Sequence, residues 1–337
     1  MHLALNPKSA SNRRWIRFTL TVGLFASVFL PISTYASESA ANAKQQQLIS
    51  QELEKFTVVE LSAEGEKFIA LWEPDRSGTP LGAILIAHGE GQTVDWPHTL
   101  HPLRTEVVKH GWATLSISLP NPKVSSIPAR ETKPTNATTV DKQPPSTSGQ
   151  TSQAEENTAT QEPPQKTKQT PPEQAAQARI KAGMEYLQAQ GQYNIVVVGN
   201  GISATRIVYF TKQLTDQAPK KQKRNIRRAK ALIERPIRAV VLINARNNIP
   251  NSEQYSQPLP EILDLPDIPI LDIYFDTHYL DQKEARERLE SATNRHKGNY
   301  FQVKVLEPSA EIFDGENRLT RRIRGFLNKH AKGVEIK

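Results

Sequence analysis

The 337-residue sequence contains no cysteine. The protein therefore has no disulfide bond and no thiolate chemistry. A lipid anchor attached at a signal-peptide cleavage site also needs a cysteine there, so that kind of anchoring is excluded. The folded protein has to be stabilised by its core alone, and the chain is long enough for one large core or two small ones.

Long apolar runs are scarce, and the clearest one, FTLTVGLFASVFLPIST, lies near the N-terminus after Arg13 and Arg14. Positive charge, apolar run and small residues in this order are typical of a secretory signal peptide. The run contains Pro31 and about 17 residues, which is short for a membrane-spanning helix. We expect residues 1–36 to be cleaved after about Ala36, leaving an exported, periplasmic protein without a transmembrane span. An uncleaved anchor and a twin-arginine export route are the alternatives.

The net charge of +8 is unevenly distributed. Residues 220–238 contain nine basic residues and one acid, interleaved with aliphatic residues, which predicts an amphipathic helix with a cationic face. This stretch is either a solvated insertion or a contact with anionic envelope material, such as a lipid headgroup or an acidic glycan. The candidate contacts are Lys220, Lys221, Lys223, Arg224, Arg227 and Arg228. Nucleic acid is not an expected partner, because no aromatic residues are interleaved.

Aromatic residues are absent from residues 121–172, which hold nine of the 24 prolines. Such a segment cannot bury enough apolar area to offset its chain entropy, so we expect a disordered insertion. Strands of the same kind resume beyond it, which argues against a domain boundary. After a polar lead-in at 37–54, residues 55–120 and 173–337 are therefore expected to form a single domain.

The rest of the chain alternates strand-like apolar runs with helical segments. The first two strands form a hairpin, and the expected strands are 56–61, 67–74, 82–87, 112–120, 193–199, 238–246, 268–275 and 300–308. Helices are expected before Gly111 and at 171–191, 202–214, 281–296 and 317–331. This order predicts an α/β fold with an N-terminal β-hairpin and a mostly parallel sheet covered by helices on both faces.

The stretch VVVGNGISA, residues 196–204, lies where a buried strand turns into a helix. In serine hydrolases this turn reads Gly-x-Ser-x-Gly, with the nucleophile at its tip. Here the tip is Gly201, which has no side chain. Ser203 lies two residues later, where we expect a small packing or capping residue. The spacing from Gly199 to Ala204 also departs from a dinucleotide fingerprint, so no nucleotide cofactor is expected.

A hydrolase of this kind also needs a histidine after its last strand, and residues 307–314 contain none. Asp276 stands where the acid of a catalytic triad could sit, but it has no histidine to orient. A rearranged catalytic set using His88, Asp95, Ser203 and Asp276 is the remaining hydrolytic alternative. Loss of the base alone would forfeit a rate factor of roughly 10²–10⁴.

Metal binding is also not expected. His98 and His101 are three residues apart, but Pro97 and Pro102 bracket them, and surface histidines are the better interpretation. No cofactor is implied by any other spacing of histidines and acids.

The loop after strand 82–87 reads AHGEGQTVDW and resembles the His-Gly loop that forms an oxyanion hole in hydrolases. If it faces the turn at Gly201, the two segments enclose a pocket for a small molecule. The expected lining comprises Glu90, Gln92, Asp95 and Trp96, with the N–H groups of Gly89, Gly201 and Ile202 as donors to an anion.

Several of these motifs also resemble a known family. They are HGEGQTVDWPHTLHPLRTEVVKHGWATLSISLP, the turn VVVGNGISA and the C-terminal NRLTRRIRGFLNKHA. Together they resemble an uncharacterised proteobacterial family with the α/β-hydrolase fold, domain of unknown function 3530. The resemblance implies an exported hydrolase-like fold without a known activity, whose elbow tip tends to be glycine. The favoured hypothesis is a non-catalytic binding protein of the cell envelope. The alternatives are an unorthodox ester or amide hydrolase, and an envelope-attached protein that uses the 220–238 stretch.

Overall fold

The computed structural model describes most of the chain after the hairpin begins, and all described residues belong to one compact unit, Gln46–Lys337. The described ranges are 57–122, 170–217, 235–252, 254–295, 298–309 and 315–332. The expected signal peptide, the polar lead-in, residues 123–169 of the insertion and the six candidate cations of the 220–238 stretch lie outside them. Within the described part, no helix is long and apolar enough to cross a membrane.

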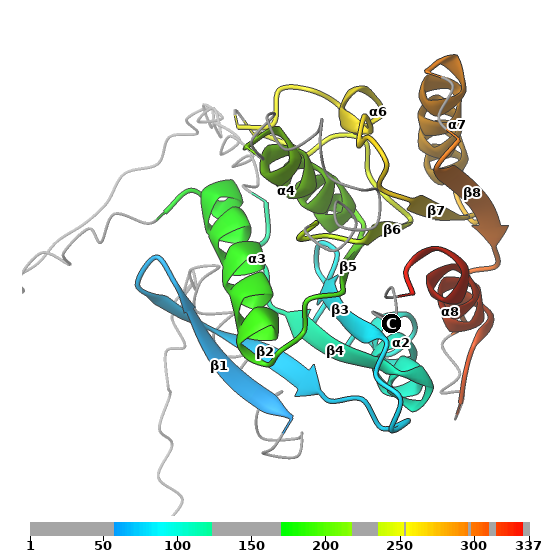
Figure 1. The fold of residues 1–337 in the computed structure, drawn as a ribbon. Helices are drawn as coiled ribbons and strands as arrows, with labels where there is room; N and C mark the ends of the chain where they lie inside the picture. The colour runs from blue at the N-terminus through cyan, green and yellow to red at the C-terminus, as the bar shows by residue number, and fades with distance from the viewer. Residues whose placement is uncertain are drawn as a thin grey trace, which may run out of the picture. The chain divides into compact units, whose positions relative to one another are not determined.

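Eight strands form one sheet in the order β1-β2-β4-β3-β5-β6-β7-β8 (Figure 1). Their bounds are β1 Val58–Ala63, β2 Glu66–Glu73, β3 Gly82–Ala87, β4 Trp112–Ile117, β5 Ile195–Asn200, β6 Ala239–Ile243, β7 Ile270–Phe275 and β8 Tyr300–Val305. Strand β2 runs antiparallel to β1 and β4, and all other neighbours are parallel. The expected hairpin and mostly parallel sheet are confirmed.

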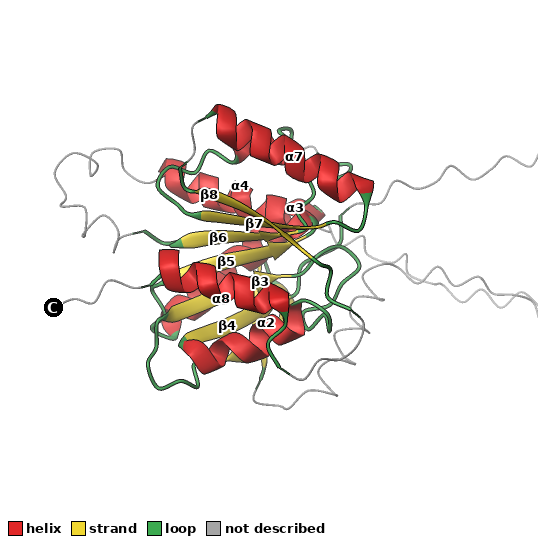
Figure 2. Cartoon of the chain, turned by 90° about the vertical axis from the view of Figure 1, so that its right-hand side faces the viewer, coloured by secondary structure: helices red, strands yellow, loops and turns green. Residues whose placement is uncertain are grey.

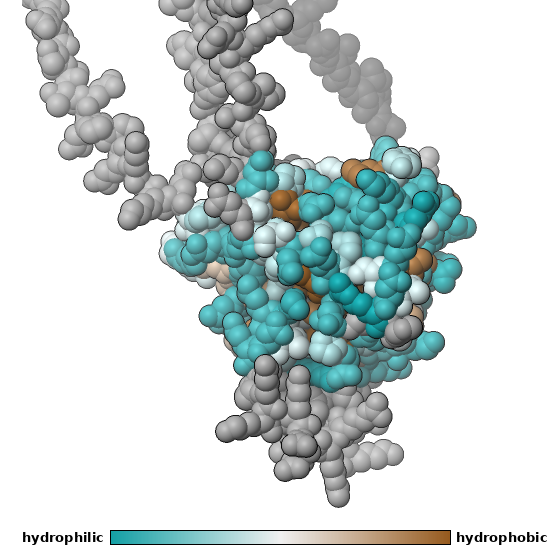
Figure 3. All heavy atoms as spheres, turned by 90° about the horizontal axis from the view of Figure 1, so that it is seen from above, coloured by the Kyte–Doolittle hydropathy of each residue, from teal (hydrophilic) through white to brown (hydrophobic). Residues whose placement is uncertain are grey.

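Helices cover both faces of the sheet, because its central strands are apolar on both sides. Helices α3 and α4 pack against one apolar cluster, and α2 and α8 pack against a second cluster on the opposite face (Figure 2). The helix bounds are α2 Leu100–Val107, α3 Pro172–Ala189, α4 Ile202–Gln217, α6 Leu259–Ile262, α7 Tyr279–Asn294 and α8 Arg318–His330. The molecular face in Figure 3 is mostly hydrophilic and carries only small, separate apolar patches.

Several strands are shorter than predicted, since β4 ends at Ile117 and β8 at Val305, and the largest difference is in β6. The run 238–246 predicts a strand of nine residues, but β6 ends at Ile243. The next residue, Asn244, has a φ of +44°, which takes the backbone out of the extended region. The chain therefore leaves the sheet early and crosses above the carboxyl end of β5, where the candidate site lies.

Both flanks of the insertion belong to the same sheet. Strand β3 pairs with β4, which precedes the insertion, and with β5, which follows it. The buried guanidinium of Arg206 also holds the two flanks together. It donates to the carbonyl of Pro120 at 2.9 Å and to both carboxylate oxygens of Glu173 at 2.7 and 2.5 Å. The insertion therefore leaves and re-enters one domain at neighbouring points.

Candidate functional site

The turn between β5 and α4 has the backbone shape of a nucleophile elbow. Gly201 has a φ of +57°, and its N–H donates to the carbonyl of Ile243 at 3.0 Å. A Cβ at Gly199 would lie closer than 3.0 Å to backbone atoms of Ser203 and Ala204. Glycine at 199 thus lets the helix start against the strand. The strand–turn–helix geometry of a hydrolase is present without a nucleophile at its tip.

The space beside Gly201 is filled by the carboxylate of Glu90, from the loop after β3. A Cβ built on Gly201 would lie closer than 3.0 Å to Glu90 Oε2. The same oxygen accepts a hydrogen bond from the N–H of Ile202 at 3.1 Å, and Glu90 Oε1 lies 3.8 Å from Arg246 Nε. A negative charge is favourable here, because Ile202 begins a helix of 16 residues.

The loop after β3 is fixed to the elbow by side-chain amides. Gln92 Oε1 accepts from the N–H of Gly89 at 3.0 Å and from Asn200 Nδ2 at 2.9 Å. Asn200, the last residue of β5, also donates to Thr99 Oγ1 at 3.3 Å. The N–H groups of Gly89, Gly201 and Ile202, expected to face an anion, thus all donate to acceptors of the protein itself. A ligand anion would reach the N–H of Ile202 only after Glu90 moves.

His88 is buried beneath this loop, and both of its ring nitrogens are engaged by the backbone. Nε2 accepts from the N–H of Leu119 at 3.0 Å, so Nδ1 carries the proton and donates to the carbonyl of Gly89 at 2.8 Å. Burial, reinforced by the positive charge of Arg206, lowers the pKa of His88 to about 4. The imidazole is therefore neutral near pH 7 and links the ends of two neighbouring strands.

The side chains of Ser203 and Asp276 bond to groups other than the imidazole of His88. Ser203 is fully buried, and its hydroxyl donates to the carbonyl oxygen of His88 at 2.5 Å. Asp276 follows β7, and its carboxylate forms an ion pair with Lys304 of β8. The structure therefore brings His88 and Ser203 together through a backbone oxygen and pairs Asp276 with a lysine.

Asp95 and Trp96 lie further along the loop, where they connect it to the body of the domain. Asp95 accepts from Arg104 Nε at 3.0 Å and from His101 Nδ1 at 2.9 Å. Burial alone would raise the pKa of Asp95, but these two partners outweigh it and lower that pKa. Trp96 packs against the α2–α8 cluster and meets the His98 ring edge-on at 6.0 Å. Both residues anchor the loop rather than face Gly201.

The sequence reasoning missed Arg246, which closes the other side of the elbow. Its N–H donates to the carbonyl of Gly201 at 3.1 Å, and Nη1 bonds Asp281 of α7 at 2.6 Å. Glu284 Oε2 lies 3.6 Å from the same nitrogen, and burial raises the pKa of Glu284. The position of Arg246 in the topology could have pointed to it, because Arg246 follows the strand that pairs with β5. No metal-binding group of three or more histidines and acids occurs among the described residues.

The strand order, the antiparallel β2 and the sharp turn after β5 together define an α/β-hydrolase fold. Solved structures share this fold at low identity. A dienelactone hydrolase from Anabaena variabilis is 12% identical, with a TM-score of 0.50 over 82% of this chain and 97% of that one. The esterase Pf2001 from Pyrococcus furiosus (12%, TM-score 0.49, 81% and 92%) and Est1E from Butyrivibrio proteoclasticus (11%, 0.49, 81% and 98%) are also similar.

Within this class, the chain belongs to the family DUF3530, described as a protein of unknown function, which it matches over residues 31–329. The family expected from the sequence motifs is therefore confirmed. No curated protein sequence matches the chain.

Proposed function

We propose that this protein is a non-hydrolytic member of the α/β-hydrolase fold that works in the cell envelope by binding. One observation carries the proposal. The carboxylate of Glu90 fills the space into which a nucleophilic side chain at position 201 would project, and it accepts the hydrogen bond of the Ile202 N–H. In an acyl-transfer enzyme, that N–H contributes to the oxyanion hole. Here the protein's own negative charge lies where the reaction would develop one.

The neighbouring residues support the same conclusion. Hydrolysis by a serine needs a hydroxyl that can attack and a base that can take its proton. The hydroxyl of Ser203 is buried and bonded to a backbone carbonyl. Both nitrogens of His88 are occupied by backbone groups. Neither residue is in a state to begin acyl transfer.

The envelope location rests on the N-terminal sequence. Positive charge, an apolar run and small residues over 1–36 have the order of a secretory signal peptide. We infer export to the periplasm with cleavage after about Ala36. Mass spectrometry of the protein recovered from a periplasmic extract tests this inference. A mature chain that starts near Ser37 supports it, and an intact N-terminus in the membrane fraction overturns it.

The catalytic part of the proposal is tested with the purified mature chain on short p-nitrophenyl esters and peptides. We expect no turnover above buffer for the wild type, Ser203→Ala or His88→Gln. Turnover by the wild type that disappears in either variant would establish the unorthodox hydrolase instead. Turnover that persists in both variants would also overturn the proposal and would direct attention to Glu90. Thermal unfolding of each variant verifies that it is folded.

A further inference from the structure

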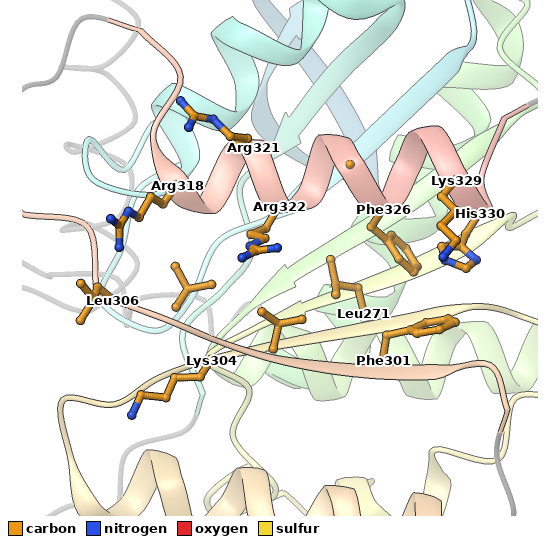
Figure 4. A pocket seen from close by; sticks show the side chains of 13 residues that line it. Leu271, Phe301, Lys304, Leu306, Arg318, Arg321, Arg322, Phe326, Lys329 and His330 are labelled. Carbon is orange, nitrogen blue, oxygen red and sulfur yellow. The ribbon is translucent and has the colours of Figure 1, made fainter.

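A second concave feature lies away from the elbow, between β8 and α8. It is an open groove of about 1050 Å³, which we call the β8–α8 groove (Figure 4). Strand β8 is the last strand of the sheet, and α8 packs over the sheet without covering the face of this edge strand completely. The volume is of the size that holds a small molecule rather than a few waters.

The floor of the groove is apolar. Leu271 of β7 and Val303 of β8 contribute to its lining, and Phe301 of β8 packs edge-to-face against Phe326 of α8, with ring centroids 6.0 Å apart (Figure 4). The ring of His330 closes this end, with centroids 4.5 Å from Phe301 and 5.0 Å from Phe326. Leu271 and Phe326 are buried, whereas Phe301 and Val303 are half-buried and leave some apolar area open to water.

The rim of the groove is cationic. Arg318, Arg322 and Lys329 recur at intervals of four and seven residues, which places them on one face of α8. All three are exposed, and none forms an ion pair within the described part of the chain. Lys304 of β8 also lines the groove, but its side chain points away from α8 and pairs with Asp276 (Figure 4).

Among the described residues, the lining contains no carboxylate, amide or hydroxyl side chain. Arginine and lysine donate hydrogen bonds but cannot accept them. A peptide segment carries N–H donors that these side chains cannot match, whereas a phosphate or carboxylate presents only acceptors to them. The chemistry of the lining therefore favours an anion attached to an apolar chain over an acidic peptide.

Gly325 lies in the middle of α8, directly on the groove. A Cβ at this position would meet nothing within 4 Å, so close packing does not require glycine here. Glycine in a helix interior is less favourable than alanine. Because Gly325 lines the groove without a side chain, we expect a large side chain at this position to fill part of it.

The two ends of the groove differ in character. Arg318 and the exposed Leu306 lie at one end, beyond the carboxyl end of β8, with Arg322 and Lys304 nearby (Figure 4). The aromatic end at His330 lies roughly 12 Å from Arg322 along the helix, at 1.5 Å per residue. A charged head and an apolar tail would each find matching surroundings.

We propose that the β8–α8 groove binds one anionic lipid molecule. Its phosphate binds Arg318 and Arg322, because guanidinium groups form paired hydrogen bonds with phosphate oxygens. Its acyl chain lies over Val303 and against the paired rings of Phe301 and Phe326, which removes apolar area from water. The proposal concerns a different site from the elbow and holds whether or not the elbow is catalytic.

The test is calorimetric titration of the mature chain with lysophosphatidylglycerol below its micelle concentration. Lysophosphatidylcholine carries the same chain with a zwitterionic head, and glycerol 3-phosphate carries a phosphate without an acyl chain. We expect binding of lysophosphatidylglycerol alone, weakened by added salt. Equal binding of the choline lipid would overturn the role of the arginines. Equal binding of glycerol phosphate would show a phosphate site without lipid, and no binding would reject the proposal.

Variants locate the binding in the groove. Gly325→Leu is expected to abolish binding by filling the groove, whereas Gly325→Ala is expected to retain it. Arg318→Gln with Arg322→Gln is expected to weaken binding about tenfold or more, as the loss of charged hydrogen bonds does. Full binding by Gly325→Leu would overturn the proposal, provided that its thermal unfolding matches that of Gly325→Ala.

The basic stretch supplies a matched control for general charge effects. Reversal of charge at Arg224, Arg227 and Arg228 is expected to leave binding of the single lipid unchanged. Loss of binding in that variant would place the lipid on the 220–238 stretch and overturn the assignment to the groove. Because the readout is binding, its outcome is independent of the ester-hydrolysis test of the elbow.

Discussion

The carboxylate of Glu90 lies where the side chain of a nucleophile at Gly201 would project. The two residues come from the loop after β3 and the turn after β5, and these strands are direct neighbours in the sheet. Glu90 remains 42% exposed in its side chain, so it covers the elbow from the solvent side. Glycine at the tip and glutamate above it are therefore complementary, because a larger residue at 201 would have to displace the carboxylate.

This complementarity predicts coupling between substitutions at Gly201 and Glu90. Gly201→Ser places a side chain at a φ of +57° and against the carboxylate, so we expect a loss of about 1–3 kcal/mol of stability. In a Glu90→Ala background the steric part disappears, and the loss should shrink by about 1 kcal/mol. Urea unfolding of the four proteins measures the cycle. Equal losses in both backgrounds would show that Glu90 does not fill this space.

The buried imidazole of His88 predicts a dependence of stability on pH. Its pKa falls from 6.5 to about 4 in the folded chain, so only the unfolded chain binds a proton between these values. Its contribution to stability is complete above pH 6.5 and is lost as the pH falls towards 4, by about 3 kcal/mol. Urea unfolding at several pH values should show a shallower dependence for His88→Gln than for the wild type.

His101 is the natural control for this measurement, because its pKa moves in the opposite direction. The hydrogen bond to Asp95 raises the pKa of His101. Its contribution is therefore complete below the ordinary pKa and is lost as the pH rises through the folded value. His101→Gln should therefore remove a loss of stability that appears as the pH rises above 6.5, and should leave the dependence below that pH unchanged. A change of the same sign in both variants would contradict the two assignments.

The buried pair of Arg206 and Glu173 predicts an asymmetric mutational cost. Glu173→Gln leaves the guanidinium buried without its counterion and should cost about 3–5 kcal/mol, whereas Arg206→Met with Glu173→Leu should cost less. The exposed pair Lys181–Glu185, at 3.8 Å, is the control. Lys181→Ala should cost less than about 1 kcal/mol. Urea unfolding compares all variants, and equal costs for the buried single and double variants would contradict the argument.

The hydrogen bonds of Arg206 to both flanks of the insertion also predict the result of removing the insertion. Pro120 and Glu173 contact one side chain, so a short linker between the flanks does not strain the fold. Replacement of residues 123–169 by about ten glycine and serine residues should raise stability by about 1 kcal/mol, because a shorter loop is closed with less entropy. Thermal and urea unfolding measure the change. A loss of several kcal/mol would show that the insertion packs against the domain.

The main strands and helices of the fold could be predicted from the local sequence. Central strands such as β3 and β5 are buried on both faces and appear as continuous apolar runs. The backbone shape of the elbow could also be predicted, because the turn leaves no space for a Cβ at Gly199 and has a positive φ at Gly201. The predicted length of β6 was wrong, because the apolar run ends at Ile243 and the positive φ of Asn244 takes the chain out of the sheet.

The side-chain contacts within the site could be predicted less well, because the partners come from segments that are distant in the sequence. Asp95 was expected to line the pocket, but it bonds Arg104 of α2 and His101. Asp276 was considered as a triad acid, and the parallel register of β7 and β8 places Lys304 beside it. Neither partner follows from the spacing of acids and histidines along the chain.

The sequence by itself determined the family, the order of strands and helices along the chain, and the absence of a nucleophile at position 201 and of a histidine in residues 307–314. These properties depend on residue identity and on short-range periodicity, which neighbouring residues specify. Only the tertiary structure decided that Glu90 reaches the N–H of Ile202, 112 residues away, and that β8 and α8 leave a cationic groove between them. The spatial order of the strands in the sheet and the packing of the helices bring those groups together, and no single segment of the chain specifies either.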